Sequence, residues 1–493
     1  MTLSYIPSDT NDEGIFKANA SGSLPNGKPV VVNADGTVSA VGSTSISTAF
    51  GTPVVFEAAS ASHISATYHP VAKKVVLFYK DAGNSSKGTY IVGTVDPSDN
   101  SISYGSAAVF EAGGVTNVSS VYDPDSGNIA VSYTDAGNSN YGTAIVGSLS
   151  GTTMTFGTAV VFSSSHTLDN DIVYDTAANK VAILYRDNGS SGHGTGIVGT
   201  ISSTSISFGS ATVFSNTGAA TTINAAYDTN AGKVVGSFSD SGSPYTGKGT
   251  AVVGTISSTS ISFGSKVIFD ASGAANYTVV AYDSTAQKVV ISYSDTGDSY
   301  RGKAIVGSVS GTSISFGTAV TYETSAAGPQ AIVYSPNVSA MTIFYRDNGN
   351  SNERSAIVGV VSGTTISFAT KVNFGAARSD YYAAAYDAEN KRIVLGYEDH
   401  GTSYHGYSVV MTVGGDELNL TAENYIGIST GGTYASGSNA TIKIIGNTSN
   451  EQSSLTAGQA YYVQTDGTLG LTADDPSVFA GTAISATRLI VKT

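Results

Sequence analysis

The sequence contains no cysteine and no tryptophan among its 493 residues, and only 12% of the residues are charged. Without cysteine the chain can form no disulfide and no thiolate metal site. The charged share is about half of what is usual in globular proteins. The charges are also unbalanced, since 37 acidic against 23 basic residues give a net charge of −14. This balance disfavours binding to nucleic acid or to an anionic membrane surface through long-range attraction.

Two targeting features are also missing from the sequence. The first residues, MTLSYIPSDTNDEGIF, have neither the basic nor the apolar region of a signal peptide. No apolar run approaches the length that spans a membrane. We therefore expect no membrane insertion, and a protein that is made in a cytoplasm and is not exported by the general secretory route.

What the chain does contain is a repeat of about fifty residues. A tyrosine recurs seven times, at intervals of 52 to 55 residues, at Tyr68, Tyr122, Tyr174, Tyr227, Tyr282, Tyr334 and Tyr386. Thirteen residues after each tyrosine comes an aspartate, with a glycine two residues later; the aspartates are Asp81, Asp135, Asp187, Asp240, Asp295, Asp347 and Asp399. A fixed period of this length with strand-like content is typical of a propeller, a solenoid or an array.

Each repeat contains four short segments with the pattern of β-strands. In the fifth repeat these are TVVAYD, KVVISYSD, KAIVGSV and SISFGTAVTY. They alternate apolar with small polar residues, and they are rich in Val, Ile, Tyr, Phe and Thr. Asp, Gly and Ser mark the turns between them. Four antiparallel strands per repeat are the composition of a propeller blade.

The ends of the repeat array distinguish a ring from an open array. The seventh repeat has no good outer strand of its own, whereas an extra segment of that type, Ser43–Phe56, precedes the first repeat. Pairing of this segment with the strand near Tyr407–Val413 would close a ring and remove the free sheet edges. The sequence therefore predicts an all-β fold in which residues 43–414 form a seven-bladed β-propeller, closed by an N-terminal strand.

The segments outside the repeats resemble each other. SLPNGKPVVVNADGTV at Ser23–Val38 matches SLTAGQAYYVQTDGTL at Ser454–Leu469, and NYIGIST near Tyr425 is echoed by VFAGTAIS near Phe479. The shared Asp-Gly turn is a hairpin signal. Because closure of the ring brings its two ends together, we expect residues 1–42 and 415–493 to form one small β-domain that serves as a docking module.

The same flanking segments carry a resemblance to a known class of proteins. ENYIGISTGGTYASGSNATIKIIG and the following LTAGQAYYVQTDGTLGLTADDPSVFAGTAISATRLIVKT resemble a terminal module of virion proteins from tailed phages, particularly marine and cyanobacterial ones. SGSLPNGKPVVVNADGTVSAV resembles the matching N-terminal piece, so the resemblance covers roughly a quarter of the chain. It implies a virion appendage such as a tail fibre or spike, and it implies no particular reaction.

The seven Asp-x-Gly turns allow a functional and a structural interpretation. The aspartates could form a ring around a metal or a sugar, or each could cap its own turn by accepting backbone N–H bonds. We favour the structural interpretation, since a residue present in every repeat is more typical of the scaffold than of a site. Asp295 with Asp298 forms the one such turn with two carboxylates, too few for the six or more oxygens that calcium prefers. We therefore predict no metal and no cofactor.

Residues that vary between the repeats are better candidates for recognition. The loops after the Asp-x-Gly turns and the connections from outer to inner strands should share one face. Tyrosine and arginine on such a rim suit recognition of glycans or proteins. The candidate rim consists of Tyr245, Tyr300, Arg301, Arg354, Arg378, Tyr381, Tyr382, Tyr404 and His405, with Tyr141 and His193 on the same face.

Three functions stay open at this level. The first is a phage tail fibre or spike that is structural and recognises a host-surface glycan or protein, with other virion proteins as partners of its terminal module. The second is a capsid or neck decoration without adhesion. The third, an enzyme that degrades surface polysaccharide, requires paired carboxylates across a cleft, which the sequence does not reveal. We expect a non-enzymatic protein located in the virion, either monomeric or a homo-oligomer.

Overall fold

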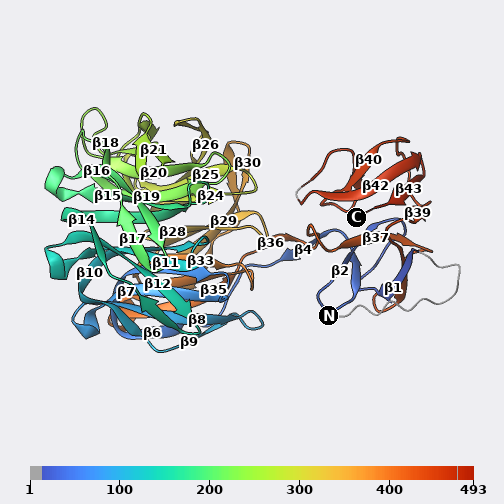
Figure 1. The fold of residues 1–493 in the computed structure, drawn as a ribbon, viewed down its shortest axis with the longest axis horizontal. Coiled ribbons are helices and arrows are strands. Elements are labelled where there is room, and N and C mark those ends of the chain that lie inside the picture. Colours follow the sequence, from blue (N-terminus) through green and yellow to red (C-terminus); the bar gives the residue numbers. More distant parts are fainter. Residues whose placement is uncertain (1–13, 475, 493) are drawn as a thin grey trace. The chain divides into compact units, whose positions relative to one another are not determined.

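The computed structural model of the chain describes residues 14–474 and 476–492. These residues are all-β, with antiparallel sheets, five 3-10 turns and no α-helix. None of the described helical segments is long and apolar enough to cross a membrane. The chain divides into two compact units, one of residues 47–414 and one of residues 1–46 with 415–493 (Figure 1). Residues 1–13 of the predicted N-terminal segment lie outside the described residues.

The larger unit contains the seven repeats, here numbered from the repeat of Tyr68 to that of Tyr386. The second strands of the repeats, each ending at the recurring aspartate, are β7 (Lys74–Asp81), β11 (Asn128–Asp135), β15 (Lys180–Asp187), β20 (Lys233–Asp240), β25 (Lys288–Asp295), β29 (Ala340–Asp347) and β34 (Arg392–Asp399). The third strands are β8 (Lys87–Asp96), β12 (Tyr141–Ser150), β16 (His193–Ser202), β21 (Lys248–Ser257), β26 (Arg301–Ser310), β30 (Glu353–Ser362) and β35 (His405–Thr412). Five of the turns between them are the 3-10 segments η1 (Ala82–Asn84), η2 (Ala136–Asn138), η3 (Asn188–Ser190), η4 (Thr296–Asp298) and η5 (His400–Thr402).

Long strands or strand pairs connect the repeats. The continuous ones, each of 16 residues, are β6 (Val54–His69), β10 (Ala108–Asp123), β14 (Val160–Asp175) and β28 (Val320–Ser335). The interrupted ones are β18 (Thr212–Ser215) with β19 (Ala220–Asp228), β23 (Val267–Asp270) with β24 (Ala275–Asp283), and β32 (Val372–Gly375) with β33 (Ser379–Asp387). The first part of each pairs with the third strand of one repeat, and the last part pairs with the second strand of the next. Each of the first six repeats also has a short strand that pairs with its third strand. These short strands are β9 (Ser101–Tyr104), β13 (Thr153–Phe156), β17 (Ser205–Phe208), β22 (Ser260–Phe263), β27 (Ser313–Phe316) and β31 (Thr365–Phe368).

The second strands are buried on both faces because each repeat packs between two neighbours. In β7, Val76 and Phe78 join a core cluster with Val131 of repeat two. The alternate residues Val75 and Leu77 point to the opposite face, as strand geometry requires, and join a cluster that contains residues of repeat seven. This two-sided burial explains why these strands are nearly continuous in apolar residues.

The first and the last repeats are joined as the sequence predicts. β35 of repeat seven pairs with β5 (Ala49–Phe50) and with the start of β6, in the register Met411 with Phe50 and Tyr407 with Val55. Contacts between first strands run from β6 through β10, β14, β19, β24, β28 and β33, and return from β33 to β6. The segment Ser43–Ile46 takes no part in this pairing, since as β4 it pairs with β36 (Gly415–Leu418) in the other unit. The predicted boundary at residue 43 therefore falls before the division between Ile46 and Ser47.

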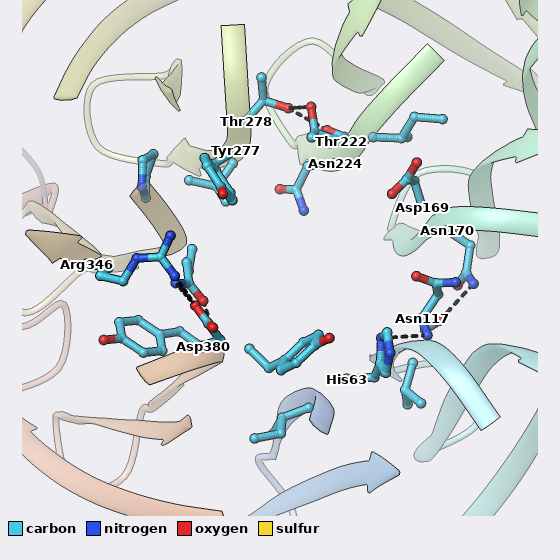
Figure 2. A pocket seen from close by; sticks show the side chains of 18 of the residues that line it. His63, Asn117, Asp169, Asn170, Thr222, Asn224, Tyr277, Thr278, Arg346 and Asp380 are labelled. Atoms are coloured by element: carbon cyan, nitrogen blue, oxygen red, sulfur yellow. Dashed lines mark hydrogen bonds and ion pairs between the residues drawn. The ribbon is translucent and has the colours of Figure 1, made fainter. Parts of the chain in front are cut away.

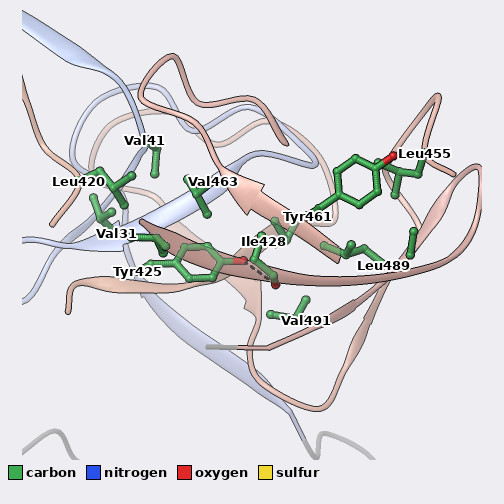
Figure 3. Close-up of a cluster of buried hydrophobic side chains, with 13 residues drawn as sticks. Val31, Val41, Leu420, Tyr425, Ile428, Leu455, Tyr461, Val463, Leu489 and Val491 are labelled. Atoms are coloured by element: carbon green, nitrogen blue, oxygen red, sulfur yellow. Dashed lines mark hydrogen bonds between the residues drawn. The ribbon is translucent and has the colours of Figure 1, made fainter. Parts of the chain in front are cut away.

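The smaller unit is built from both ends of the chain, which Figure 1 shows by its mixture of blue and red strands. One sheet has the order β1 (Ile15–Asn19), β38 (Asn439–Lys443), β37 (Tyr425–Thr430), β2 (Pro29–Val32), β3 (Val38–Ala40). The second has the order β39 (Thr448–Ser449), β43 (Arg488–Val491), β42 (Val478–Ser485), β40 (Ala460–Val463), β41 (Leu469–Gly470). Apolar side chains of both sheets form one shared core (Figure 3), and the Tyr425 hydroxyl donates to the Ala480 carbonyl at 3.4 Å.

The two sheets contain matching substructures. In the β2–β3 turn, Asp35 accepts the backbone N–H of Thr37 at 2.9 Å, and in the β40–β41 turn Asp466 accepts that of Thr468 at 2.9 Å. Gly427 in β37 and Gly481 in β42 have φ of 152° and 154°. At each of them an added Cβ would come within 2.0 or 2.1 Å of a carbonyl oxygen of the adjacent strand, so only glycine fits. The similarity between the flanking sequences therefore reflects a four-strand motif that occurs twice, as β2–β3 with β37–β38 and as β40–β41 with β42–β43. In the first copy the two strand pairs come from opposite ends of the chain.

We expect the smaller unit to fold without the repeats. Ile46 and Gly415 are directly opposed in the β4–β36 pair, so replacement of residues 47–414 by Asn-Gly would convert this pair into a hairpin with a favoured two-residue turn. The expected product is a folded β protein with a cooperative thermal transition, measured by circular dichroism and by amide dispersion in NMR spectra. A matched variant that joins the same residues through Pro-Pro should fold less well, because this linker cannot adopt the hairpin turn. A disordered Asn-Gly product would contradict the expectation.

Candidate functional site

The seven recurring aspartates hold their own turns. In each repeat the carboxylate accepts a backbone N–H from two or three residues further along, over 2.8–3.2 Å. The donors are the N–H groups of Asn84, Asn138, Gly189, Gly242, Gly297, Asn350 and Gly401. This geometry is the one that the structural interpretation of the Asp-x-Gly turns describes.

In several repeats a positively charged side chain forms an ion pair with the recurring aspartate. In repeat six the Lys371 ammonium lies 2.7 Å from Asp347 and 2.6 Å from Glu323. In repeat five the Lys303 ammonium lies 2.7 Å from Asp295 and 2.9 Å from Asp298, the two carboxylates of the turn for which the sequence predicts no calcium. In both repeats a lysine ammonium group therefore lies between two carboxylates.

Repeats one and two have the glutamate and the aspartate that correspond to Glu323 and Asp347, but they lack a lysine at the position of Lys371. Asp135 faces Glu111, which accepts the Tyr133 hydroxyl at 2.8 Å, just as Glu323 accepts that of Tyr345 at 3.1 Å in repeat six. Burial raises the pKa of Asp135, and the charge of Glu111 raises it further. Because the folded pKa is above the unfolded one, Asp135 lowers stability above its folded pKa, and this cost disappears as the pH falls through that value toward the unfolded pKa.

Introduction of the missing lysine should therefore stabilise repeat two. Ala159 occupies the position of Lys371, since Val160 pairs with Ala144 as Val372 pairs with Ala356. We expect Ala159→Lys to raise the free energy of unfolding by about 1–2 kcal/mol at neutral pH, and the gain should vanish in acid, where the carboxyl is protonated in both variants. Urea titrations at several pH values measure this, with Ala159→Gln as the uncharged control; an equal gain in the control would refute the electrostatic explanation.

The structure distributes the predicted rim residues between surface and interior. Tyr300, Tyr381 and Tyr404 are 52%, 40% and 48% exposed, and the Arg301 and Arg378 side chains also reach solvent. Tyr245 and His405 are partly buried. The Lys266 ammonium lies 3.9 Å from the centre of the Tyr245 ring.

Two of the predicted rim residues are instead buried, and for them the prediction of an open surface is wrong. Tyr382 is 5% exposed because the pairing register shifts between Asp380 and Ala383, and this bulge leaves the Tyr381 side chain exposed and the Tyr382 side chain buried. Arg354 is 8% exposed. It stands where all six other repeats have a glycine facing the packed interior, and it uses the space above Gly375 to reach Asp399 at 2.8 Å.

A cavity of about 480 Å³ forms where the first strands of all seven repeats meet. Its size is in the range of small-ligand sites. Of the predicted rim it includes Arg378, Tyr381 and Tyr382, and not the other six residues. Figure 2 shows side chains on several sides of the open space, with Asn224 pointing into it.

The cavity lining depends on a bulge that recurs in the first strands. The pairing register shifts in each repeat just before the recurring tyrosine. A bulge of this kind redirects a side chain out of the regular alternation. In six repeats the residue five positions before that tyrosine has positive φ and lines the cavity: His63, Asn117, Asp169, Thr222, Tyr277 and Tyr381. In repeat six the position is Pro329, whose ring excludes positive φ.

One wall of the cavity is a charged cluster around Asp380. Its carboxylate is in contact with the Arg346 guanidinium, with Arg378 at 2.8 Å and with His400 at 3.1 Å. Gln330 donates to it at 3.2 Å. On the opposite wall Asp169 pairs with Arg186 at 3.1 Å. The four charged residues of the lining, Asp169, Asp380, Arg346 and Arg378, thus sum to zero.

His63 contributes a neutral ring to the same cavity. Burial lowers the pKa of His63 to about 4, and the nearby Lys80 charge contributes. Its Nδ1 accepts the Asn117 N–H at 3.1 Å, so the proton of the neutral ring lies on Nε2. The ring lies 4.7 Å from that of Tyr381, centre to centre. The hydrogen bond from Asn117 and the contact with Tyr381 therefore hold the imidazole with its Nε2–H as a donor and with no net charge near neutral pH.

Comparison with known proteins adds no identification. No protein-family model and no curated protein matches the chain. Solved structures that are similar to it include a protein of unknown function from Dyadobacter fermentans, with TM-score 0.45 and 12% identity over 76% of this chain and 99% of that one. They also include a protein from Lactobacillus plantarum, with TM-score 0.45 and 14% identity over 70% of this chain and 97% of that one. Similarity at this level carries no argument about function.

Sequence reasoning missed most of the cavity residues, although a signal for them exists. The position five residues before each repeat tyrosine reads His, Asn, Asp, Thr, Tyr, Pro and Tyr. The positions on either side vary as much, reading Ser, Thr, Leu, Thr, Asn, Gly, Asp before it and Ile, Val, Asn, Ile, Thr, Gln, Tyr after it, so a variable stretch of three residues precedes the constant tyrosine. Its variability, combined with its place at the start of the inner strand, could have indicated the site.

Proposed function

We propose that residues 47–414 form a seven-bladed β-propeller that binds a surface glycan in this cavity, without catalysis. The observation that carries the proposal is the construction of the cavity from one recurring bulge that presents a different side chain in nearly every repeat. A constant scaffold with varied side chains at one place is typical of a recognition site.

The propeller assignment has its support in the pairing and packing of the repeats. The first strands contact one another in a cycle, and β35 takes its outer partner from β5 and β6 at the other end of the unit. A core cluster joins repeat one to repeat seven through residues such as Leu77 and Val394. These are the contacts that a closed ring of blades requires.

Binding rather than catalysis is favoured by the state of the carboxylates. Asp169 and Asp380 both form ion pairs with arginines. Carboxylates held in this way orient hydroxyl groups of a ligand, whereas hydrolysis of a glycan requires one carboxyl as proton donor and a second facing it across the bond. The proposal includes no cofactor.

The setting of this activity is a virion appendage of a tailed phage, either a tail fibre or a spike. Its support is the resemblance of the two flanking segments to terminal modules of such proteins. In this setting the smaller unit attaches the chain to other virion proteins, and the repeats present the cavity to the host cell.

Binding of the purified chain to bacterial cells tests recognition. The labelled protein should bind susceptible cells, and periodate oxidation of the cell-surface glycans should abolish binding. Retention of binding after periodate, with loss after protease treatment of the cells, would replace the glycan by a protein receptor. Absence of binding to any strain that the source phage infects would reject the recognition function.

Immunogold labelling of phage particles tests the setting separately. Gold on the tail or on fibres agrees with an adhesin. Gold on the capsid would make the chain a decoration protein instead, and particles without gold would reject the virion setting.

A further inference from the structure

Four tyrosines of the larger unit are exposed in spite of an unfavourable backbone. Tyr277, Tyr300, Tyr381 and Tyr404 are 40–52% exposed. They are the four aromatic residues with strongly exposed side chains among the described residues. All four have positive φ, between 52° and 68°. A bulky side chain in this left-handed region costs stability, and an exposed ring returns little of it through burial.

The equivalent positions in other repeats hold residues that tolerate this backbone better. Where Tyr277 and Tyr381 stand, repeats two and three have Asn117 and Asp169. Where Tyr300 and Tyr404 stand, repeats two and three have Asn140 and Gly192. The scaffold therefore does not require tyrosine at either position, and the strain is retained in two repeats for another reason.

These tyrosines form two matched pairs. Repeat five supplies Tyr277 in the bulge and Tyr300 before its third strand, and repeat seven supplies Tyr381 and Tyr404 at the same two positions. Three of the rings are supported from one side: the Arg346 guanidinium carbon lies 6.0 Å from the centre of Tyr277, and the rings of His63 and His400 lie 4.7 and 4.5 Å from those of Tyr381 and Tyr404. Support of this kind holds a flat ring in place before the ligand arrives.

Repeat six lies between the two pairs and contributes polar groups. Gln330 and Arg346 line the cavity there, and both are bonded to Asp380 of repeat seven. Asp169 pairs with Arg186, and Asp380 pairs with both Arg346 and Arg378, whose second positive charge lies near the Glu398 carboxylate. The charges in and around the cavity are therefore compensated within the chain, and little net charge is left for an ionic ligand. Planar rings offer apolar faces to the C–H surfaces of sugars, and amides can donate to and accept from their hydroxyls.

We infer that the ligand is an uncharged oligosaccharide chain that spans repeats five to seven, with one tyrosine pair at each end and the Asp380 cluster in the middle. This inference rests on the proposed glycan recognition and specifies its ligand. Several sugar rings must bind together, because the two pairs belong to repeats that are not neighbours. Affinity should therefore rise with the length of the chain until both pairs are occupied.

A glycan array followed by calorimetry tests the inference, with the full chain as the protein. The array carries neutral oligosaccharides of increasing length and acidic ones that contain uronic or sialic acid. The expected result is binding to neutral chains, tighter with length and little affected by salt, since no charge is exchanged. Binding confined to acidic glycans, or binding lost in high salt, would overturn the inference and leave glycan recognition intact.

Substitutions taken from the other repeats separate binding from folding. Tyr381→Asn and Tyr300→Asn should each weaken binding of the longest neutral chain roughly tenfold, while Tm stays the same or rises because strain is relieved. Asn140→Ser, at the position of Tyr300 in repeat two, is the matched control and should bind as the wild type does. Tyrosine variants with unchanged affinity would overturn the inference, and failure of the wild type to bind any glycan on the array would reject it together with glycan recognition.

Discussion

Replacement of Arg354 by methionine should lower the free energy of unfolding of the repeat unit by about 3–5 kcal/mol at neutral pH. Arg354 and Asp399 have side chains only 10% and 9% exposed and lie 2.8 Å apart. The same guanidinium donates to the Ser379 hydroxyl at 3.1 Å, and its carbon lies 5.0 Å from the centre of the Tyr397 ring. Methionine fills most of the volume but leaves the Asp399 carboxylate buried without its cation.

The control for this prediction is Arg301→Met. Arg301 pairs with Asp298 at 3.0 Å, but the two side chains are 43% and 34% exposed. Exposed pairs contribute little, so a change within about 0.5 kcal/mol is expected. Urea denaturation monitored by circular dichroism gives both values. A loss below about 1 kcal/mol in Arg354→Met would show that water or rearrangement compensates Asp399, contrary to the buried geometry.

Replacement of Phe56 by alanine should lower the free energy of unfolding of the repeat unit by about 3–5 kcal/mol. Phe56 belongs to the strand that joins the two ends of the repeat unit, and its ring lies over Gly406 of repeat seven, where an added Cβ would come within 2.6 Å of it. It also contacts the ring of Tyr79 at 5.1 Å in an edge arrangement. The substitution leaves a cavity at the junction of the first and last repeats and weakens the closing strand.

Phe214→Ala is the matched control, because the repeat places the same aromatic–glycine contact inside the array. Phe214 lies over Gly194 and 5.1 Å from the Phe238 ring, and like Phe56 it is 7% exposed. Calorimetry of both variants should give similar losses in the free energy of unfolding if residues 54–60 stabilise the repeat unit as much as an internal strand does. A small loss for Phe56→Ala with a full loss for Phe214→Ala would mean that the repeat unit does not depend on its closing strand.

Much of the fold could be predicted because it follows from features repeated seven times. The strand-forming residues of segments such as KVVISYSD and the fixed place of Asp295 and its equivalents predicted the second strands and their turns. The missing outer strand of repeat seven indicated its pairing with the N-terminal strand, since an unpaired edge is unfavourable.

The site was less predictable because it depends on positions where individual repeats depart from the common pattern. Tyr381 and Tyr382 are adjacent and similar in the sequence, yet a bulge exposes the first and buries the second. The direction of Arg354 depends on the absence of a side chain at Gly375, which is distant in the sequence. Composition alone assigns tyrosine and arginine to a recognition surface, and only tertiary packing separates the exposed ones from those that stabilise the core.

The pairing of both N-terminal segments with C-terminal ones constrains how the chain can fold during its synthesis. β2 can form its pairing with β37, and the first part of β6 its pairing with β35, only after the later strand of each pair has been synthesised. At roughly 5–20 residues per second, this delay lasts for tens of seconds on the ribosome. During that time the nascent chain exposes two unpaired strand edges, which favour association with neighbouring chains. A chain released before Thr412 can complete neither unit, so truncated products should remain unfolded and be open to proteolysis rather than accumulate in a partly folded form.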